Sequence, residues 1–293
     1  MMVHALLTVL SLAAATPHTT ATSESSITVR VTGQGRPMIL IPGFVSSGDV
    51  WTSVVDHYKS HFECHVVTVA GFAGTAPVTP VSLQRVRDDL IAYVKAKKLE
   101  HPVIVGHSLG GVLAIWIAET DPSMAGAIVS VDGVPFLPAL MNPAATVESV
   151  RTQATQMKAL YESMTPAQLG AQSRLAFSGM ISDQAQVDQA TKWAETSDPK
   201  TAAALLNDLF TTDIRSDVGK IAAPLLLIPA VKAMAESPDM VKSALAGYES
   251  QIAAAPRHEV VAAQTLHFVM LDDPAFLLKT MDVFLAKHSA ARP

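Results

Sequence analysis

The chain has 293 residues and a mass of 31.0 kDa, and its residues are 49% hydrophobic but only 5% aromatic, so its core must be mainly aliphatic. The net charge of −5 gives no basic footprint for nucleic acid, and a charged fraction of 16% disfavours a disordered chain. Because Cys64 is the only cysteine, an intrachain disulfide and a cysteine-based zinc site are excluded, which leaves a globular enzyme or binding protein.

Residues 1–26 have the layout of a secretory signal peptide. The apolar run from Ala5 to Ala15 is too short to span a bilayer, and it ends in three alanines, a cleavage-type sequence before a Thr/Ser-rich stretch. His4 is the only basic-type residue before the run, so an uncleaved tail of a cytoplasmic protein is the alternative. No other run reaches the length of a membrane span, and we therefore predict an exported protein without one.

From residue 27 onward, segments typical of strands and helices alternate. Apolar and β-branched runs predict strands at 27–32, 38–41, 65–69, 102–105 and 127–131. Helical spacing predicts helices at about 50–59, 83–98 and 109–119. Ser82 is the expected N-cap of the second of these helices. Alternating units of this kind predict a parallel sheet covered by helices on both faces.

The alternation stops after the fifth predicted strand. Residues 134–216 contain helical segments with polar faces but no convincing strand, which predicts an inserted helical cap. The earlier pattern then resumes with a strand at 224–228, a helix at 240–253, a short strand at 259–262 and a final helix at 274–287. The expected organisation is an α/β core, formed by residues 27–133 and 217–293, that carries the cap at 134–216.

Residues 106–110 read GHSLG and match the pattern G-x-S-x-G. The motif follows the predicted strand at 102–105 and opens the helix at 109–119. A nucleophilic serine needs this setting, because it sits in a strained turn and only small residues two positions away let the strand and the helix approach each other. The hydroxyl of Ser108 then lies at a helix N-terminus, where backbone N–H groups can stabilise an anion.

Three segments, GQGRPMILIPGF, HPVIVGHSLGG and LHFVMLDDP, resemble the α/β-hydrolase family. The resemblance covers nearly all of residues 27–288 and implies a mostly parallel, doubly wound sheet with the insertion as its cap. It implies that Ser108 is the nucleophile and that the N–H groups of Leu109 and Phe44 form the oxyanion hole. It also implies a general base between the last strand and the last helix, where His267 matches.

The acid of the triad departs from the commonest family pattern. In that pattern the acid follows the family's seventh strand, but here no carboxylate occurs after that strand until Glu236. Another branch of the family has the acid after the sixth strand, and Asp132 directly follows the matching run at 127–131. A carboxylate there can accept the ring N–H of His267 and stabilise the imidazolium. We assign Asp132 on this basis, with Glu236 and Asp239 as alternatives.

Other candidate sites are weaker. His57, His61 and His65 recur every four residues, as on the metal-binding face of a helix, but a strand is predicted to begin at the third of them. No Cys or carboxylate cluster completes a metal site, and Gly33 and Gly35 precede a strand rather than forming a phosphate loop. We expect neither a metal nor a cofactor.

The insertion is expected to determine the substrate. It contains four methionines, whose adaptable side chains either line a pocket for apolar groups or fill the core: Met141, Met157, Met164 and Met180. A peptidase acting on free N-termini would instead need cap carboxylates that face the pocket. The candidates for such a role are Glu148, Glu162, Asp183, Asp188 and Glu195.

The sequence predicts a serine esterase that acts on a small apolar ester through an acyl-enzyme. Ser108, rather than an aspartate, argues against epoxide-hydrolase or dehalogenase chemistry. Two alternatives remain open. The same triad can serve as a peptidase or amidase, a C–C hydrolase, a perhydrolase or an acyltransferase, and the chain can be a non-catalytic ligand-binding protein on the same scaffold. The oligomeric state is left open.

Overall fold

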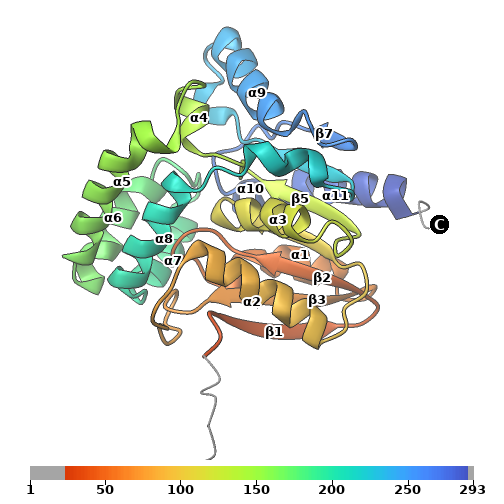
Figure 1. The fold of residues 1–293 in the computed structure, drawn as a ribbon, viewed down its shortest axis with the longest axis horizontal. Helices are drawn as coiled ribbons and strands as arrows, with labels where there is room; N and C mark the ends of the chain where they lie inside the picture. Colours follow the sequence, from red (N-terminus) through yellow and green to blue (C-terminus); the bar gives the residue numbers. More distant parts are fainter. Residues whose placement is uncertain (1–23, 290–293) are drawn as a thin grey trace, which may run out of the picture.

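A computed structural model describes residues 24–289, and its central element is a seven-stranded sheet (Figure 1). The strand order is β1-β3-β2-β4-β5-β6-β7, and every neighbouring pair is parallel except β1 and β3. The strands are β1 (Ile27–Gly33), β2 (Arg36–Ile41), β3 (Phe62–Val69), β4 (Val103–His107), β5 (Ala127–Val131), β6 (Leu225–Ile228) and β7 (His258–Val260). Most of the predicted signal peptide, residues 1–23, lies outside the described residues.

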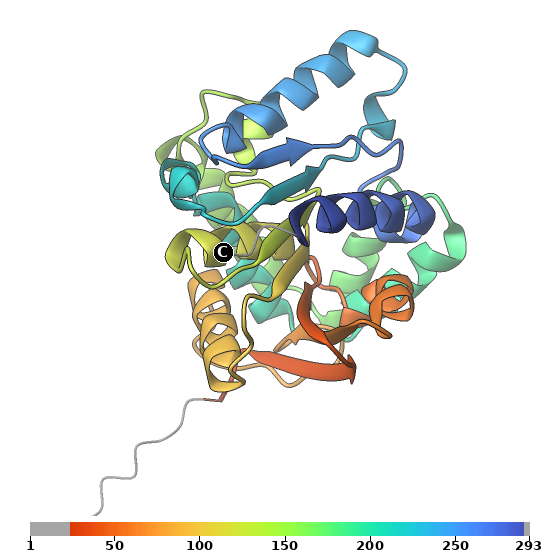
Figure 2. The same ribbon diagram turned by 90° about the vertical axis from the view of Figure 1, so that its right-hand side faces the viewer.

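Helices cover both faces of this sheet (Figure 2). Helices α2 and α3 lie on one face, and α1 and α11 lie on the other. The core helices are α1 (Thr52–Tyr58), α2 (Leu83–Ala96), α3 (Leu109–Thr120), α9 (Pro238–Ile252), α10 (Val269–Asp272) and α11 (Pro274–Ser289), with short 3-10 turns η1 (Gly48–Trp51), η2 (Arg215–Lys220) and η3 (Lys232–Met234). The predicted α/β fold with a mostly parallel, doubly wound sheet is confirmed.

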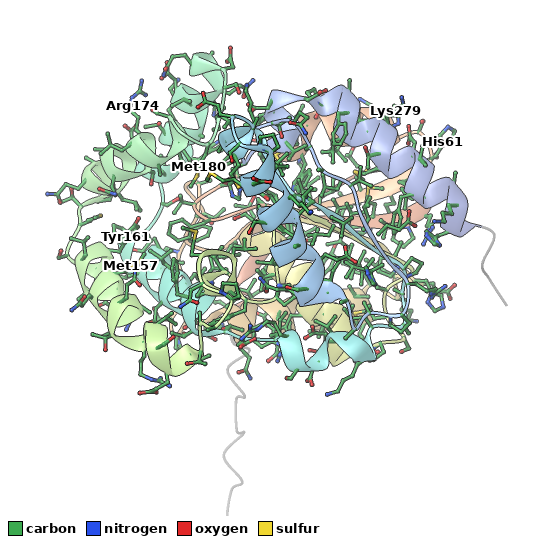
Figure 3. The ribbon with its side chains drawn as sticks, turned by 90° about the horizontal axis from the view of Figure 1, so that it is seen from above. His61, Met157, Tyr161, Arg174, Met180 and Lys279 are labelled. Carbon is green, nitrogen blue, oxygen red and sulfur yellow. The ribbon has the colours of Figure 1, made fainter. Side chains whose placement is uncertain are left out.

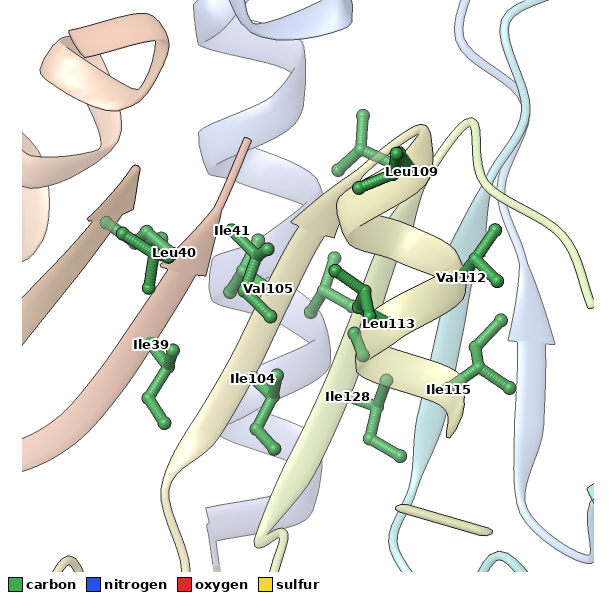
Figure 4. Close-up of a cluster of buried hydrophobic side chains, with 14 of the residues drawn as sticks. Ile39, Leu40, Ile41, Ile104, Val105, Leu109, Val112, Leu113, Ile115 and Ile128 are labelled. Atoms are coloured by element: carbon green, nitrogen blue, oxygen red, sulfur yellow. The ribbon is translucent and has the colours of Figure 1, made fainter. Parts of the chain in front are cut away.

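The central strands are buried from end to end because helices lie on both sides of them. Leu40 of β2, Ile104 of β4 and Leu113 of α3 are completely inaccessible to solvent and belong to the same cluster of buried hydrophobic side chains (Figure 4). Burial of each such side chain contributes about 1.5–3 kcal/mol relative to exposure. The continuous apolar runs in the sequence therefore correspond to strands buried on both faces.

Most element boundaries agree with the sequence within a few residues. Ser82 is the N-cap of α2, and its hydroxyl accepts a hydrogen bond from the backbone N–H of Arg85 at 3.1 Å. Strand β3 begins at Phe62, three residues before the predicted start, because this end of the strand pairs with both β1 and β2. Glu63 in that extension is polar, so hydrophobicity alone did not reveal the pairing.

Residues 134–216 form helices α4 (Pro138–Met141), α5 (Val147–Glu162), α6 (Pro166–Phe177), α7 (Gln184–Glu195) and α8 (Pro199–Thr211), followed by the start of η2. Helix α5 packs on α8 and α6 packs on α7, so the segment forms a layer beside the sheet (Figure 1). Capping boxes begin α5 and α6, at Thr146 and Thr165. Among residues 24–289, no helix has both the length and the apolar character needed to cross a membrane.

Candidate active site

Ser108 lies in the sharp turn between β4 and α3. Its φ of 53° and ψ of −117° are unusual for a residue with a side chain, and holding such a conformation costs about 1–3 kcal/mol. The turn is held by backbone hydrogen bonds: the N–H of Ser108 donates to Val131 at 2.9 Å, and its carbonyl accepts from Gly111 at 2.8 Å. The serine is thereby fixed at the N-terminus of α3, beside the end of β5.

The two glycines of the motif are required by this close approach. A Cβ atom at Gly106 would lie 1.9 Å from the carbonyl oxygen of Gly110, and one at Gly110 would lie 2.3 Å from the carbonyl oxygen of Ile41. Real Cβ atoms do not approach backbone oxygen so closely. The sequence prediction that only small residues fit around Ser108 thus has a direct structural cause.

His267 and Asp132 are joined by a short hydrogen bond. The ring Nδ1 of His267 lies 2.5 Å from Oδ2 of Asp132, so Nδ1 carries the proton and Nε2 is left as the acceptor. Asp132 follows β5, as the sequence predicts, and also adopts a left-handed conformation, with a φ of 52°. The alternatives Glu236 and Asp239 are both exposed and have no hydrogen bond to His267.

The second oxygen of Asp132 is also occupied. Its Oδ1 accepts hydrogen bonds from the hydroxyl of Tyr248 at 2.6 Å and from the backbone N–H of Ala230 at 3.0 Å. Burial and the neighbouring Asp132 charge raise the pKa of Tyr248 well above its usual value, so it remains a donor at every ordinary pH. Sequence analysis did not find Tyr248, because it lies on α9, 116 residues away from its partner.

Two backbone N–H groups near Ser108 are available as donors. Leu109 is the first residue of α3, and helix geometry gives its N–H no acceptor. Phe44 follows β2 and precedes Val45, whose φ is 46°. Within residues 24–289, neither the Leu109 nor the Phe44 N–H donates to another protein group. They match the oxyanion donors that the family resemblance implies.

His107, inside the motif, has a larger role in the structure than the sequence indicated. It is fully buried between Gly43 and His267, and its Nε2 donates to the backbone carbonyl of His267 at 3.1 Å. The ring packs against the rings of His267 and Phe268, with centroids 4.6 Å away in each case. Burial lowers the pKa of His107 well below its usual value, and the nearby His267 lowers it further, so His107 stays neutral.

Ser108, His267 and Asp132 all border one cavity of about 390 Å³ between the sheet and the cap. Of the six described non-glycine residues with positive φ, three border this cavity: Val45, Ser108 and Asp132. The cap contributes a mainly apolar wall, which consists of Leu137, Leu140, Met157, Tyr161, Ser173, Ala176, Phe177, Met180, Leu206, Leu209 and Phe210. Among the described residues, no Lys or Arg borders the cavity.

The four cap methionines have different positions. Met157 and Met180 border the cavity, and Figure 3 shows them with Tyr161 on the cap side of the molecule. Met164 borders a separate surface groove between α5 and α6, and Met141 is 90% exposed. The cap carboxylates that a peptidase would use are exposed and do not border the cavity: Glu148, Glu162, Asp183, Asp188 and Glu195.

The three histidines with four-residue spacing are not brought together. His57 contacts the Asp282 carboxylate at 3.0 Å, whereas Nδ1 of the buried His65 lies 2.8 Å from the hydroxyl of Tyr93. In the part of the chain that the structure describes, no three His, Cys, Asp or Glu side chains are grouped so as to hold a metal ion.

Comparisons with known proteins show what this chain is similar to. A model of the alpha/beta hydrolase family matches residues 38–280. A pimeloyl-[acyl-carrier protein] methyl ester esterase of Aeromonas salmonicida is 29% identical over 211 residues, which cover 69% of this chain and 79% of that protein. The Vibrio cholerae enzyme of the same name is 26% identical over 202 residues, covering 67% of this chain and 76% of that protein.

Solved structures show the same fold at low sequence identity. A hydrolase from Pseudomonas aeruginosa has a TM-score of 0.72 and 17% identity, covering 88% of this chain and 94% of that one. An enol-lactonase from Burkholderia xenovorans has a TM-score of 0.72 and 14% identity, covering 89% of this chain and 96% of that one. At these identities the likeness concerns the fold alone.

Proposed function

Because the chain belongs to the alpha/beta hydrolase family, we propose that it is a serine esterase that cleaves carboxylic esters through a covalent acyl-enzyme. One observation carries this proposal: Ser108, in a strained turn, borders the same cavity as His267, whose Nδ1 is hydrogen-bonded to Asp132 at 2.5 Å. A nucleophile, a base and an acid that orients the base are the parts that acyl transfer needs.

In the first half of the reaction, Nε2 of His267 takes the hydroxyl proton of Ser108 while Oγ attacks the ester carbonyl. The N–H groups of Leu109 and Phe44 donate to the oxyanion, and removing one such donor typically costs about 3–4 kcal/mol of transition-state stabilisation. The imidazolium then gives its proton to the leaving alcohol as the ester C–O bond breaks, and an acyl-serine remains.

In the second half, His267 removes a proton from water, which attacks the acyl-serine and forms a second oxyanion. The carboxylic acid leaves as Ser108 regains its proton. Throughout, Asp132 stabilises the imidazolium through Oδ2, while Tyr248 and Ala230 hold Oδ1 in a fixed position.

The cavity supports a small, neutral, apolar ester as the substrate. Its wall is mainly aliphatic and aromatic, and it contains no described Lys or Arg that would pair with a free carboxylate. The relatives named methyl ester esterases support the ester class. A peptidase specific for free N-termini has less support, because the cap carboxylates proposed for that role lie away from the cavity.

The test combines labelling with a substrate series. A fluorophosphonate probe should label the wild-type protein at Ser108, and p-nitrophenyl esters of graded chain length should be hydrolysed. The Ser108→Ala variant should lose both reactions while keeping the wild-type melting temperature. A folded wild-type protein that the probe does not label would support the non-catalytic alternative, whereas labelling without ester turnover would favour another acyl chemistry.

We also propose that the protein is exported, on the basis of the signal-peptide layout of residues 1–26. Expression of the full chain in a secreting bacterial host should yield an exported protein whose first residue is Thr16, after cleavage behind Ala15. Recovery of a protein with an intact N-terminus from the cytoplasm alone would contradict this proposal.

A further inference from the structure

One carboxylate, that of Asp272, joins the loop that carries His267 to the cap. Asp272, the last residue of α10, accepts hydrogen bonds from the backbone N–H of Ser182 at 2.8 Å and from its hydroxyl at 2.9 Å. The same carboxylate accepts from the N–H of Leu266 at 3.0 Å. Ser182 lies between α6 and α7 of the cap, and Leu266 is the residue before His267.

Further contacts join the same two segments. The N–H of Phe268, the residue after His267, donates to the carbonyl of Met180 in the cap at 3.2 Å. The ring of Phe268 packs edge-on against Phe177 of α6, with centroids 5.6 Å apart. The ammonium group of Lys232 donates to the Ser182 hydroxyl at 3.0 Å, which leaves that hydroxyl's proton directed to Asp272.

These contacts matter because His267 is in neither a helix nor a strand. Its backbone is fixed by what its neighbours contact: Leu266 bonds to Asp272, Phe268 bonds to the cap, and the carbonyl of His267 accepts from His107. Of these partners, Asp272 alone contacts both the loop and the cap through one side chain. The position of the imidazole is therefore linked to the docking of the cap segment at residues 180–182.

We propose that Asp272 is a positioning residue that couples cap docking to the placement of His267. This inference rests on the proposed function, since it assigns His267 the role of base. When the cap segment is docked on Asp272, the loop holds the imidazole against Asp132, in the cavity that Ser108 also borders. When the carboxylate is lost, Leu266 and Ser182 lose a shared acceptor and the loop gains freedom.

The test compares adjacent aspartates. Asp272→Ala removes the shared acceptor. Asp272→Asn keeps one of the two acceptor oxygens, so it can preserve only some of the hydrogen bonds from Ser182 and Leu266. Asp273→Ala is the matched control, because Asp273 caps α11 by accepting from the N–H of Phe276 at 2.9 Å and contacts neither the cap nor Leu266. Ser182→Ala removes the hydroxyl with its bonds to Asp272 and Lys232, and leaves the bond between Asp272 and Leu266 in place.

The readouts separate positioning from general destabilisation. A base displaced by about 1 Å costs on the order of 100-fold in rate, so Asp272→Ala should lower kcat by about 10- to 100-fold with little change in KM. The downfield NMR signal of the proton between His267 and Asp132 should broaden, and amide exchange at Leu266 and Phe268 should accelerate. Asp272→Asn and Ser182→Ala should show smaller effects in the same direction.

Asp273→Ala should keep kcat within about twofold of the wild-type value and retain the NMR signal. Its melting temperature should fall, because the substitution removes the cap of α11. Equal losses of kcat in Asp272→Ala and Asp273→Ala, or an unchanged kcat in Asp272→Ala, would overturn the proposal. If the wild-type protein hydrolysed no ester, the esterase assignment would be wrong, whatever the role of Asp272. The NMR signal and the amide exchange would then still decide whether Asp272 holds the His267 loop.

Discussion

At the scale of single residues, backbone strain and buried polar groups concentrate around the site. Ser108 and Asp132 both adopt left-handed conformations that ordinary side chains avoid, and Asp132 uses both carboxylate oxygens. Strain of this kind persists only where the surroundings enforce it. Here the close packing of β4, β5 and α3 does so, and it places Ser108 and Asp132 at the carboxyl ends of these two neighbouring strands.

The choice of Asp132 as the acid leads to a direct prediction. Asp132→Asn should lower kcat for a p-nitrophenyl ester by about 10⁴-fold, because the amide favours the wrong imidazole tautomer. Glu236→Gln and Asp239→Asn should leave kcat within about twofold, since neither side chain contacts His267. Steady-state kinetics of the three purified variants measure this. Loss of activity in Glu236→Gln with retention in Asp132→Asn would reverse the assignment.

A second residue-scale prediction concerns Glu119 of α3. Its side chain is buried, neither carboxylate oxygen has a partner among the described residues, and burial raises the pKa to about 8, with the charge of Asp217 adding to the effect. Between its unfolded pKa of 4.5 and about 8, the native state binds more protons than the unfolded state, so this carboxyl makes stability fall as the pH rises.

Glu119→Gln should remove that contribution. At about pH 9 the variant should be more stable than the wild type by about 1–3 kcal/mol, the typical cost of a buried group without a partner, and the difference should shrink towards about pH 5. Thermal unfolding at the two pH values measures this, with the exposed Glu100→Gln as a control. If the variant is no more stable than the wild type at the higher pH, the buried charge of Glu119 does not destabilise the protein.

At the scale of elements, two helices each contain a glycine, but only one of these glycines is required by close packing. Gly110 in α3 lies against the end of β2, where a Cβ atom would meet the carbonyl of Ile41 at 2.3 Å. A Cβ atom at Gly247 in α9 would face open space, with nothing within 4 Å beyond the neighbouring backbone of its own helix. The first glycine allows a helix and a strand to meet, whereas the second only adds flexibility to a helix.

Alanine at these two positions should therefore change stability in opposite directions. Gly247→Ala should stabilise the protein by about 0.5–1 kcal/mol, because alanine loses less backbone entropy in a helix. Gly110→Ala should destabilise it by at least about 2 kcal/mol and displace Ser108, with loss of fluorophosphonate labelling. Denaturant unfolding curves measure both effects, and a neutral Gly110→Ala would refute the steric explanation of the motif.

At the scale of the whole molecule, the cap and the sheet share one cavity. Loops of the α/β core supply Ser108, His267 and Asp132, while the cap supplies most of the apolar wall. We therefore expect different segments of the chain to determine substrate preference and chemistry. The Asp272 contacts join those segments at the His267 loop.

Changes in the cap wall should accordingly alter chain-length preference and leave the chemistry intact. Met157→Ala should raise the ratio of kcat/KM for p-nitrophenyl octanoate over butanoate by about 10-fold, a typical value for a methylene-sized change in an apolar pocket. Met164→Ala is the control, because Met164 borders the outer groove of the cap instead of the cavity. An equal change in both variants would show that the cavity wall does not determine the chain-length preference.

The sequence by itself determined the features that depend on short-range patterns. Apolar runs and helical spacing predicted the strands, the helices and the interruption at residues 134–216. The segment at 106–110 predicted the turn that carries Ser108, because its glycine spacing reflects a local steric need. The resemblance to a family supplied His267, Phe44 and Leu109, which no periodicity could single out.

Only the tertiary structure decided which distant groups meet. It placed Asp132, rather than Glu236 or Asp239, against His267, 135 residues away, and added Tyr248 as a second partner of that carboxylate. It also revealed the contacts of Asp272 with Ser182 and Leu266. The physical reason is that periodicity records which face of an element is buried, whereas a hydrogen bond between side chains depends on how whole elements are packed in space.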